Sequence, residues 1–243
     1  MPFTACHPAA ILPFITGNKK RFSTTGLVVG SIVPDFEYLL RFKVISDYSH
    51  TILGIFWLDL PLALVIAFTF HCLIRNSFIN NLPLFVKRKV IVSLEFNWPK
   101  YFLSHWIIVL YSMVIGIATH LIWDSFTHQN GFFIHLWSLE EFSIDLFNIS
   151  IPLYKLAQHT SSLIGGLAIF GSFLQLPEQP TEHVPNAQYW LITFAIAFIF
   201  TIIYLLFNFK SLIIGNLIVS MISITLSSIL LTSVVYQIKV KPV

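Results

Sequence analysis

The ten residues THLIWDSFTH, numbered 119–128, close a long apolar run that begins at Phe102. They place a histidine, an aspartate and a second histidine four residues apart, at His120, Asp124 and His128. Residues four apart share one face of an α-helix, about one turn from each other. His120 and Asp124 can therefore reach one cation, or Asp124 can bridge two. On a straight helix His128 lies roughly 12 Å from His120, by ~1.5 Å rise per residue, so all three bind one ion only if the helix ends or bends.

The composition is that of an integral membrane protein. Of the 243 residues, 56% are hydrophobic and 10% are charged, and the mean hydropathy is +0.79. Soluble domains carry about 25% charged residues. We expect an all-α polytopic membrane helix bundle. The net charge of +3 is small and no basic segment is interleaved with aromatic residues, so we expect no nucleic-acid partner. Cys6 and Cys72 are too few for a disulfide framework and are expected to be free thiols.

The distribution of apolar residues predicts about five transmembrane helices after a short helical N-terminal region. Residues 8–15 and 26–40 fall short of the ~20 apolar residues of a span, and we expect short interfacial or re-entrant helices there. The predicted spans are 51–74, 102–123, 161–176, 189–209 and 212–236. We treat residues 1–243 as one membrane domain, in which 1–165 form the metal-site module and 189–236 add two further transmembrane helices.

Two connections between the predicted spans are long. Residues 75–100 are rich in lysine and arginine, which is typical of a solvated basic loop at a membrane surface. Residues 124–158 combine aromatic and acidic side chains, which indicates amphipathic, interfacial structure that caps the bundle.

Five spans would bring many potential ligands to one face of the membrane. The N-terminal region precedes the first span, the second span returns to the same face, and the third leaves from it. Imidazole nitrogens and carboxylate oxygens are ligands of divalent transition metals. The sequence therefore predicts a metal site at this face. The candidate ligands are His7, Asp35, His50, His120, Asp124, His128 and His159. Lysine and arginine are equally numerous on the two sides, which leaves open which face this is.

Six motifs, in order over residues 1 to about 165, resemble the bacterial membrane family called domain of unknown function 4184. They are MPFT-x-x-HPAA, G-S-x-V-P-D-F-E-Y, S-H-T-x-x-G, D-x-P, H-x-x-W-D-S-F-T-H and Q-H-x-S. That family is similar to predicted membrane-bound metal-dependent hydrolases. More distantly, the order of ligands resembles that of zinc-dependent phospholipase C, an all-helical enzyme with a cluster of zinc ions.

The resemblance implies a division of the ligands between two ions. One ion would be held by Asp35, His50, His120 and Asp124, and His7 would join Asp124 at a second, with Asp124 as the bridge. The soluble enzymes also use their N-terminal residue, a tryptophan, where this chain begins Met1-Pro2. They place a glutamate four residues after their last histidine, whereas Leu163 follows His159 here. These departures argue against a further ion at His128 and His159.

These observations lead to a hydrolase hypothesis and two alternatives. The hypothesis is a metal-dependent hydrolase in the bacterial cytoplasmic (inner) membrane, with one or two divalent ions, zinc first among them. Membrane lipid, or a lipid-linked phosphoester or ester, is the expected partner. Asp124 and Glu37 are the candidate catalytic residues, although Glu37 is equally well explained as an interfacial carboxylate. The alternatives are a cation transporter and a non-catalytic protein with a structural ion or a hydrogen-bonded His/Asp cluster. The sequence leaves the oligomeric state open.

Overall fold

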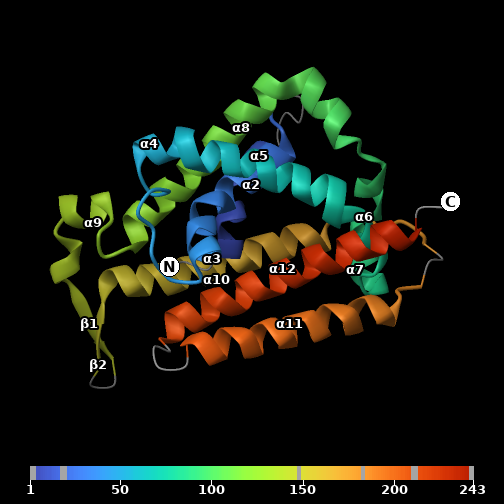
Figure 1. Ribbon diagram of the computed structural model, residues 1–243. Coiled ribbons are helices and arrows are strands. Elements are labelled where there is room, and N and C mark those ends of the chain that lie inside the picture. The colour runs from blue at the N-terminus through green and yellow to red at the C-terminus, as the bar shows by residue number, and fades with distance from the viewer. Residues whose placement is uncertain (1–3, 17–20, 147–148, 182–183, 209–212, 241–243) are drawn as a thin grey trace. The chain divides into compact units, whose positions relative to one another are not determined.

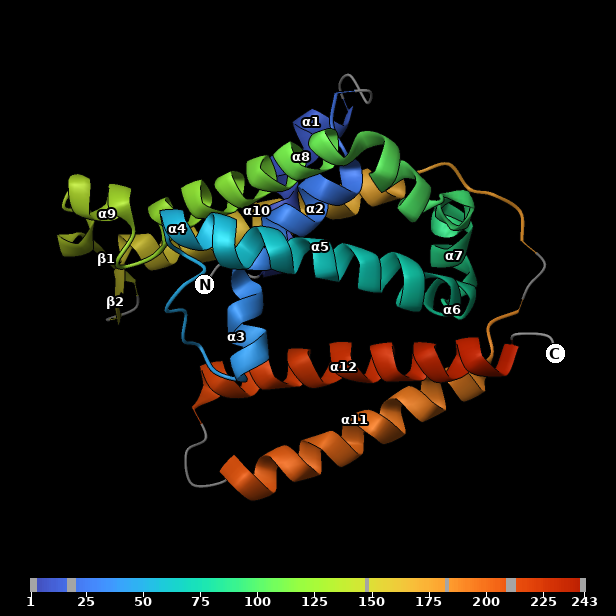
Figure 2. The same cartoon turned by 45° about the horizontal axis from the view of Figure 1, so that its top comes forward.

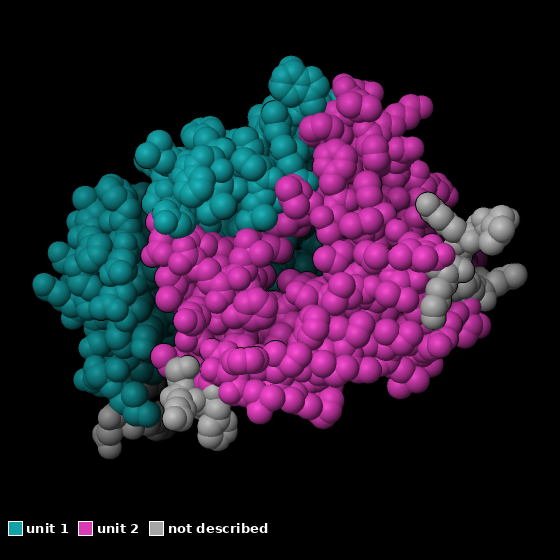
Figure 3. All heavy atoms as spheres, in the orientation of Figure 1, with its two compact units in different colours: residues 1–35, 48–64, 105–175 teal, residues 36–47, 65–104, 176–243 magenta. Residues whose placement is uncertain are grey.

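The computed structural model describes residues 4–16, 21–146, 149–181, 184–208 and 213–240 (Figure 1). The chain divides into two compact units, coloured separately in Figure 3. Unit 1 comprises residues 1–35, 48–64 and 105–175, and unit 2 comprises residues 36–47, 65–104 and 176–243. Nearly all described residues in regular structure are helical, which confirms the predicted all-α class.

Four helical runs in the described part of the chain are long and apolar enough to cross a membrane. The protein is therefore an integral membrane protein. The first run, Ile52–Asn80, contains two π-helical turns. Its segments are α4 (Ile52–Gly54), η3 (Ile55–Asp59), α5 (Leu60–Thr69), η4 (Phe70–Ile74) and α6 (Arg75–Asn80). The other three are α8 (Trp98–Thr127), α11 (Ala187–Asn208) and α12 (Ile214–Val240, apolar to Ile238).

The segment expected as the third of five spans, residues 161–176, lies mostly within α10 (Leu153–Leu174). This helix is 22 residues long but is not among the four apolar runs. Its first half carries Lys155, Gln158 and His159, followed by three hydroxyl side chains at 160–162. These polar residues lower the hydropathy, so the count of such helices is four rather than five.

Unit 1 is built on close contact between two helices, α2 (Thr24–Ile32) and α8. The side chain of Ser23 caps α2 by accepting a hydrogen bond of 3.1 Å from the Gly26 nitrogen. A Cβ atom on Gly30 would collide with the backbone carbonyl of Met113 in α8. The glycine therefore allows the two backbones to touch. The other N-terminal elements of the unit are η1 (Thr4–Ile11), α1 (Leu12–Thr16) and η2 (Val33–Asp35).

The predicted interfacial segment, residues 124–158, begins in the last turn of α8 and ends in α10; the described residues between these helices form short helical elements and two paired strands. Strands β1 (Ser143–Leu146) and β2 (Ile149–Pro152) pair in antiparallel register, with Ser143 opposite Pro152. They follow α9 (Phe132–Leu136) and η6 (Leu139–Glu141). Phe132, Trp137 and Phe142 are more than half exposed, as an interfacial segment requires. Their insertion into a membrane surface stays a prediction.

The expectation of a solvated basic loop at residues 75–100 is wrong. These residues form α6, α7 (Leu84–Val90), η5 (Ile91–Glu95) and the start of α8, all within unit 2. Arg75 and Lys87 are buried, and both bind backbone carbonyls. The Lys87 ammonium donates to the Asn80 carbonyl (2.9 Å), and the Arg75 guanidinium donates to the Phe96 carbonyl (2.6 Å). Cations placed among carbonyls that lack an intrahelical partner are stabilised even when buried.

The remainder of unit 2 consists of α11 and α12, which lie side by side, and α3 (Phe36–Arg41), which meets α12 (Figure 2). Hydroxyl groups of α12 bind the carbonyls at the end of α3. Ser223 donates to the Leu39 carbonyl (2.8 Å) and Ser220 to the Phe42 carbonyl (3.1 Å). The predicted segment 26–40 is therefore two helices, α2 and α3, joined by η2 and divided between the two units.

Candidate metal centre

Four of the predicted ligands come together in unit 1. Asp35, His50, His120 and Asp124 each offer one ligand atom, and these four atoms all lie within 4.8 Å of one another. Asp35 ends η2, His50 lies in the loop before α4, and the other two are one turn apart on α8. The i, i+4 spacing therefore places His120 and Asp124 on the same face of α8, as the sequence predicts.

The spacing of these atoms suits coordination better than hydrogen bonding. Asp124 Oδ2 lies 3.3 Å from His120 Nε2 and 3.4 Å from His50 Nε2. Asp35 Oδ1 lies 3.6 Å from His120 Nε2 and 3.9 Å from His50 Nε2. Hydrogen bonds between nitrogen and oxygen are about 2.7–3.2 Å long. Zinc bonds of about 2.0–2.2 Å give tetrahedral ligand separations of roughly 3.3–3.6 Å, close to those observed.

The burial of Asp35, Asp124 and His120 favours a bound cation. Asp35 is 2% exposed, Asp124 6% and His120 0%. The Oδ1 atom of Asp35 and the Nε2 atom of His120 have no hydrogen-bond partner among the described residues. Two carboxylates removed from water are costly unless they are paired or bind a metal. The donor set therefore fits a divalent ion.

Two hydrogen bonds orient the ligands from behind. His120 Nδ1 donates to the Ser31 carbonyl (2.8 Å), which leaves the lone pair of Nε2 directed at the carboxylates. The Thr4 hydroxyl donates to Asp35 Oδ2 (2.6 Å), which leaves Oδ1 to face the other ligands. Histidine ligands in metal sites almost always donate their second nitrogen in this way. No local sequence signal marks Thr4 and Ser31 as partners of the ligands, although both belong to the first two of the six motifs.

The second oxygen of Asp124 faces another pair of imidazoles. Asp124 Oδ1 lies 3.5 Å from His7 Nε2 and 3.5 Å from His128 Nδ1. The ring of His7 stacks on that of His120, with centroids 3.7 Å apart and planes at 18°. Both nitrogens of buried His7 lack a hydrogen-bond partner among the described residues. His128 Nδ1 also donates to the Asp124 backbone carbonyl (3.1 Å), so His7 is the imidazole on this side whose two nitrogens both lack such a partner. The Asp124 carboxylate thus lies between His7 and the pair His50 and His120, as a bridge between two ions would.

The protonation states outside the membrane-spanning helices suit metal binding. Burial and the neighbouring His120 together lower the pKa of His7 to about 4, so His7 is neutral at pH 7. Burial also lowers the pKa of His128. Burial raises the pKa of Asp35, but the nearby His120 imidazole and the hydrogen bond from Thr4 outweigh this, and the pKa is lowered overall. Neutral imidazoles and ionised carboxylates are the forms that bind metal ions.

The comparison with protein families bears directly on these residues. The family model described as Domain of unknown function (DUF4184) matches residues 1–235. The chain belongs to this family. The match confirms the resemblance and extends it beyond residue 165, through α11 and most of α12. No curated protein and no solved structure matches the chain.

Two further predicted residues are not among the four clustered ligands of this DUF4184 chain. His159 is exposed on α10, whereas the preceding residue, Gln158, is 8% exposed. The structure therefore does not bring His159 to the ligands. The helix instead joins α8 through a hydrogen bond of 3.1 Å from Trp123 Nε1 to Ser161 Oγ.

Glu37 belongs to unit 2, whereas the cluster belongs to unit 1. Its carboxylate is buried and accepts from the Arg41 guanidinium (2.7 Å), the Ser46 hydroxyl (2.9 Å) and the Asp47 backbone nitrogen (3.1 Å). These contacts favour a role in holding the turn after α3. A catalytic role for Glu37 stays a prediction.

Proposed function

We propose that this DUF4184 protein is a membrane-embedded, metal-dependent hydrolase that cleaves a phosphoester or ester of a lipid or lipid-linked substrate. The observation that supports it most strongly is the group of buried Asp35, His120 and Asp124 with partly exposed His50, whose ligand atoms are spaced for one shared ion. We propose zinc as the ion and the bacterial cytoplasmic membrane as the location.

The protein's own residues supply a rigid and partly accessible site. Ser31 and Thr4 fix the directions of His120 and Asp35. His50 differs from the others because its side chain is 25% exposed, so solvent or substrate can approach the cluster there. A bound zinc ion supplies Lewis acidity and activates water for attack near neutral pH.

The bridging position of Asp124 favours a phosphoester over other esters. Its Oδ2 atom faces His50 and His120, whereas its Oδ1 atom faces His7 and His128. Sites with two ions about 3.5–4 Å apart are common in phosphatases and nucleases, where both reacting oxygens of the phosphoester are stabilised. In a protein with four apolar spans, the accessible phosphoesters are those of membrane lipids and lipid-linked intermediates.

A structural metal site is the competing function, and one observation favours it. Four protein ligands are sufficient to close the tetrahedral shell of a structural zinc ion. Against it stands the composition of the set, since structural zinc sites are built mainly from cysteine and histidine, and two of the four ligands here are carboxylates.

Hydrolysis of defined lipids by the purified, zinc-loaded protein tests the proposal. The substrates are phosphatidic acid, phosphatidylglycerol and a polyprenyl diphosphate in mixed micelles, with released phosphate or diacylglycerol as the readout. We expect turnover that is lost in Asp124→Asn and retained in His159→Ala, which changes an exposed histidine outside the cluster. Zinc bound by the wild-type chain without turnover of any of these lipids or of a water-soluble phosphodiester would favour the structural site.

A further inference from the structure

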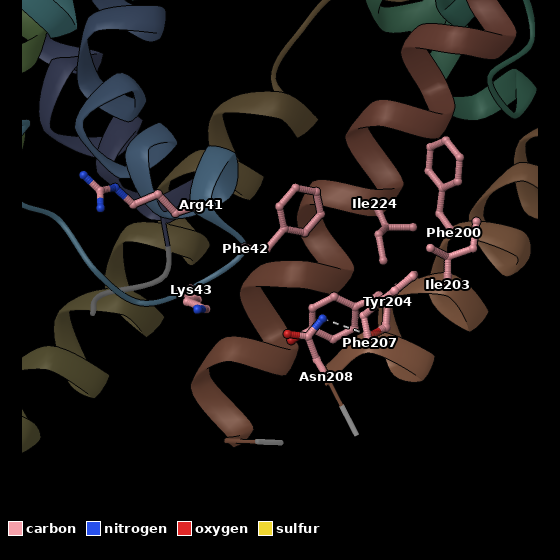
Figure 4. A pocket seen from close by; sticks show the side chains of 9 residues that line it. All are labelled: Arg41, Phe42, Lys43, Phe200, Ile203, Tyr204, Phe207, Asn208 and Ile224. Carbon is pink, nitrogen blue, oxygen red and sulfur yellow. Dashed lines mark hydrogen bonds between the residues drawn. The ribbon is translucent and has the colours of Figure 1, made fainter. Parts of the chain in front are cut away.

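Unit 2 contains a cavity that the metal chemistry does not use. Its volume is about 440 Å³, and it lies among the turn after α3, the C-terminal half of α11 and the middle of α12 (Figure 4). Its wall is largely aromatic, with Phe42, Phe200, Tyr204 and Phe207. Cavities of roughly 300–1,000 Å³ with apolar walls are typical of small-molecule sites.

Two cationic residues, Arg41 and Lys43, line the same cavity, but the charge of Arg41 is already balanced by carboxylates. The Arg41 guanidinium binds the carboxylates of Glu37 and Asp47, each at 2.7 Å, and it points away from the aromatic side chains (Figure 4). Lys43 is exposed, and the structure shows no ion pair for its ammonium within the described ranges. The cavity thus combines an apolar wall with one uncompensated positive charge.

The residue between these two cations has an unusual backbone. Phe42 has φ = 54°, in the left-handed region that bulky residues rarely adopt. The Ser220 hydroxyl binds its carbonyl (3.1 Å), and its ring stacks on that of Tyr204, with centroids 6.4 Å apart. Strained residues that are held by several contacts cluster at ligand sites. Here the Phe42 ring lines the cavity together with Lys43, the next residue in the chain.

We propose that this cavity binds an anionic phospholipid, with the phosphate at Lys43 and an acyl chain along Phe42, Phe200 and Phe207. Charge complementarity selects the head group, because Lys43, the lining cation for which the described residues provide no ion pair, lies beside an apolar wall. The helices α11 and α12 that form this wall are apolar spans, so membrane lipid has direct access to it. The proposal does not depend on the metal cluster, whose residues all belong to unit 1.

Photo-crosslinking in nanodiscs tests the site. The full chain is reconstituted with trace phosphatidylglycerol that carries a diazirine on one acyl chain, and the crosslinked peptides are identified by mass spectrometry. Phosphatidylcholine with the same diazirine chain is the zwitterionic control, because its choline ammonium offsets the charge of its phosphate. We expect phosphatidylglycerol to label residues 200–208 in preference to the rest of α11. Phosphatidylcholine should label them roughly threefold to tenfold less, because its choline ammonium weakens one exposed charge-assisted contact between the phosphate and Lys43.

Three variants sharpen this experiment. Lys43→Gln removes the charge and Ile203→Trp fills the cavity, and each should reduce the labelling of residues 200–208 by phosphatidylglycerol. Lys100→Gln removes another exposed lysine of unit 2 and should leave the labelling unchanged. Circular dichroism and gel filtration confirm that each variant is folded. Equal labelling by the two lipids would overturn the assignment of an anionic head group. Labelling spread evenly along α11, and unaffected by Ile203→Trp, would overturn the cavity as a lipid site.

Discussion

The Nδ1 nitrogen of His120 donates a hydrogen bond of 2.8 Å to the backbone carbonyl of Ser31, which couples the candidate metal ligand to the backbone of α2. The position of that carbonyl depends in turn on the contact between Gly30 in α2 and Met113 in α8. The direction of the His120 lone pair is therefore set by helix packing.

The Gly30→Ala substitution tests this coupling. The added methyl group would collide with the Met113 carbonyl and push α2 from α8. We expect the free energy of unfolding to fall by about 1–3 kcal/mol, as for an overpacked core. Zinc affinity should fall roughly 10–100-fold, as for lost orienting partners. Thermal unfolding and zinc titration measure the two effects. Gly171→Ala in α10 is the control, because no atom lies within 4 Å of its added Cβ. A normal zinc affinity in destabilised Gly30→Ala would contradict the coupling.

The Thr4→Val substitution tests the orientation of Asp35. Valine has nearly the same shape but cannot donate the hydrogen bond of 2.6 Å to Asp35 Oδ2. We expect a loss of roughly 10–100-fold in zinc affinity with little change in secondary structure. Competition with a chromogenic chelator gives the affinity. Thr160→Val, which removes an exposed hydroxyl on α10, should bind zinc as the wild type does. Equal zinc affinity in the two variants would show that the hydrogen bond from Thr4 to Asp35 does not contribute to zinc binding.

The His7→Ala substitution tests whether the site holds two ions or one. His7 contacts Asp124 Oδ1, whereas the four-ligand group uses Oδ2. In His7→Ala we expect the zinc content to fall from about two ions to about one per chain, because the bridging carboxylate and the other ligands remain. Isothermal titration calorimetry of the metal-free protein gives the stoichiometry. The same stoichiometry in His7→Ala and the wild type would limit the site to a single ion.

Buried Lys87 makes the stability of the protein depend on pH. Burial lowers the pKa of its ammonium below the usual 10.5. Between the two values the unfolded chain binds more protons than the folded chain, so the free energy of unfolding rises with pH across this interval. As the pH rises through this interval toward 10.5, we expect the wild type to gain stability relative to Lys87→Met. Thermal melts of both proteins measure the difference, and a difference that does not change with pH would refute the prediction.

The site could be predicted from the sequence where local spacing or motif order decides it. His120 and Asp124 lie four apart in a helix, and that spacing alone brings them together. Asp35 and His50 were predicted from motif order and topology. The donors and carbonyls behind the ligands could not be predicted, because the contacts of Thr4 with Asp35 and of Ser31 with His120 join distant parts of the chain.

The predictions from sequence are wrong where tertiary packing overrides composition. A run of lysine and arginine predicts a solvated loop, but free carbonyls at the end of α6 make a buried position acceptable for Lys87. Likewise, the motif Q-H-x-S contains two polar residues that could face the core. The rotation of α10 buries Gln158 and exposes His159, and composition does not determine a rotation.

Metal content tests the central claim most directly. The detergent-purified wild type, Asp124→Asn, His50→Ala and the control His159→Ala are compared by elemental analysis after dialysis against trace zinc. We predict one or two equivalents of a transition metal, zinc first, in the wild type and in His159→Ala, and little or none in folded Asp124→Asn and His50→Ala. No bound metal in the wild type, even after reloading with zinc or manganese, would contradict the account. His120 and Asp124 would then be buried polar side chains that only stabilise the packing of α8 within unit 1.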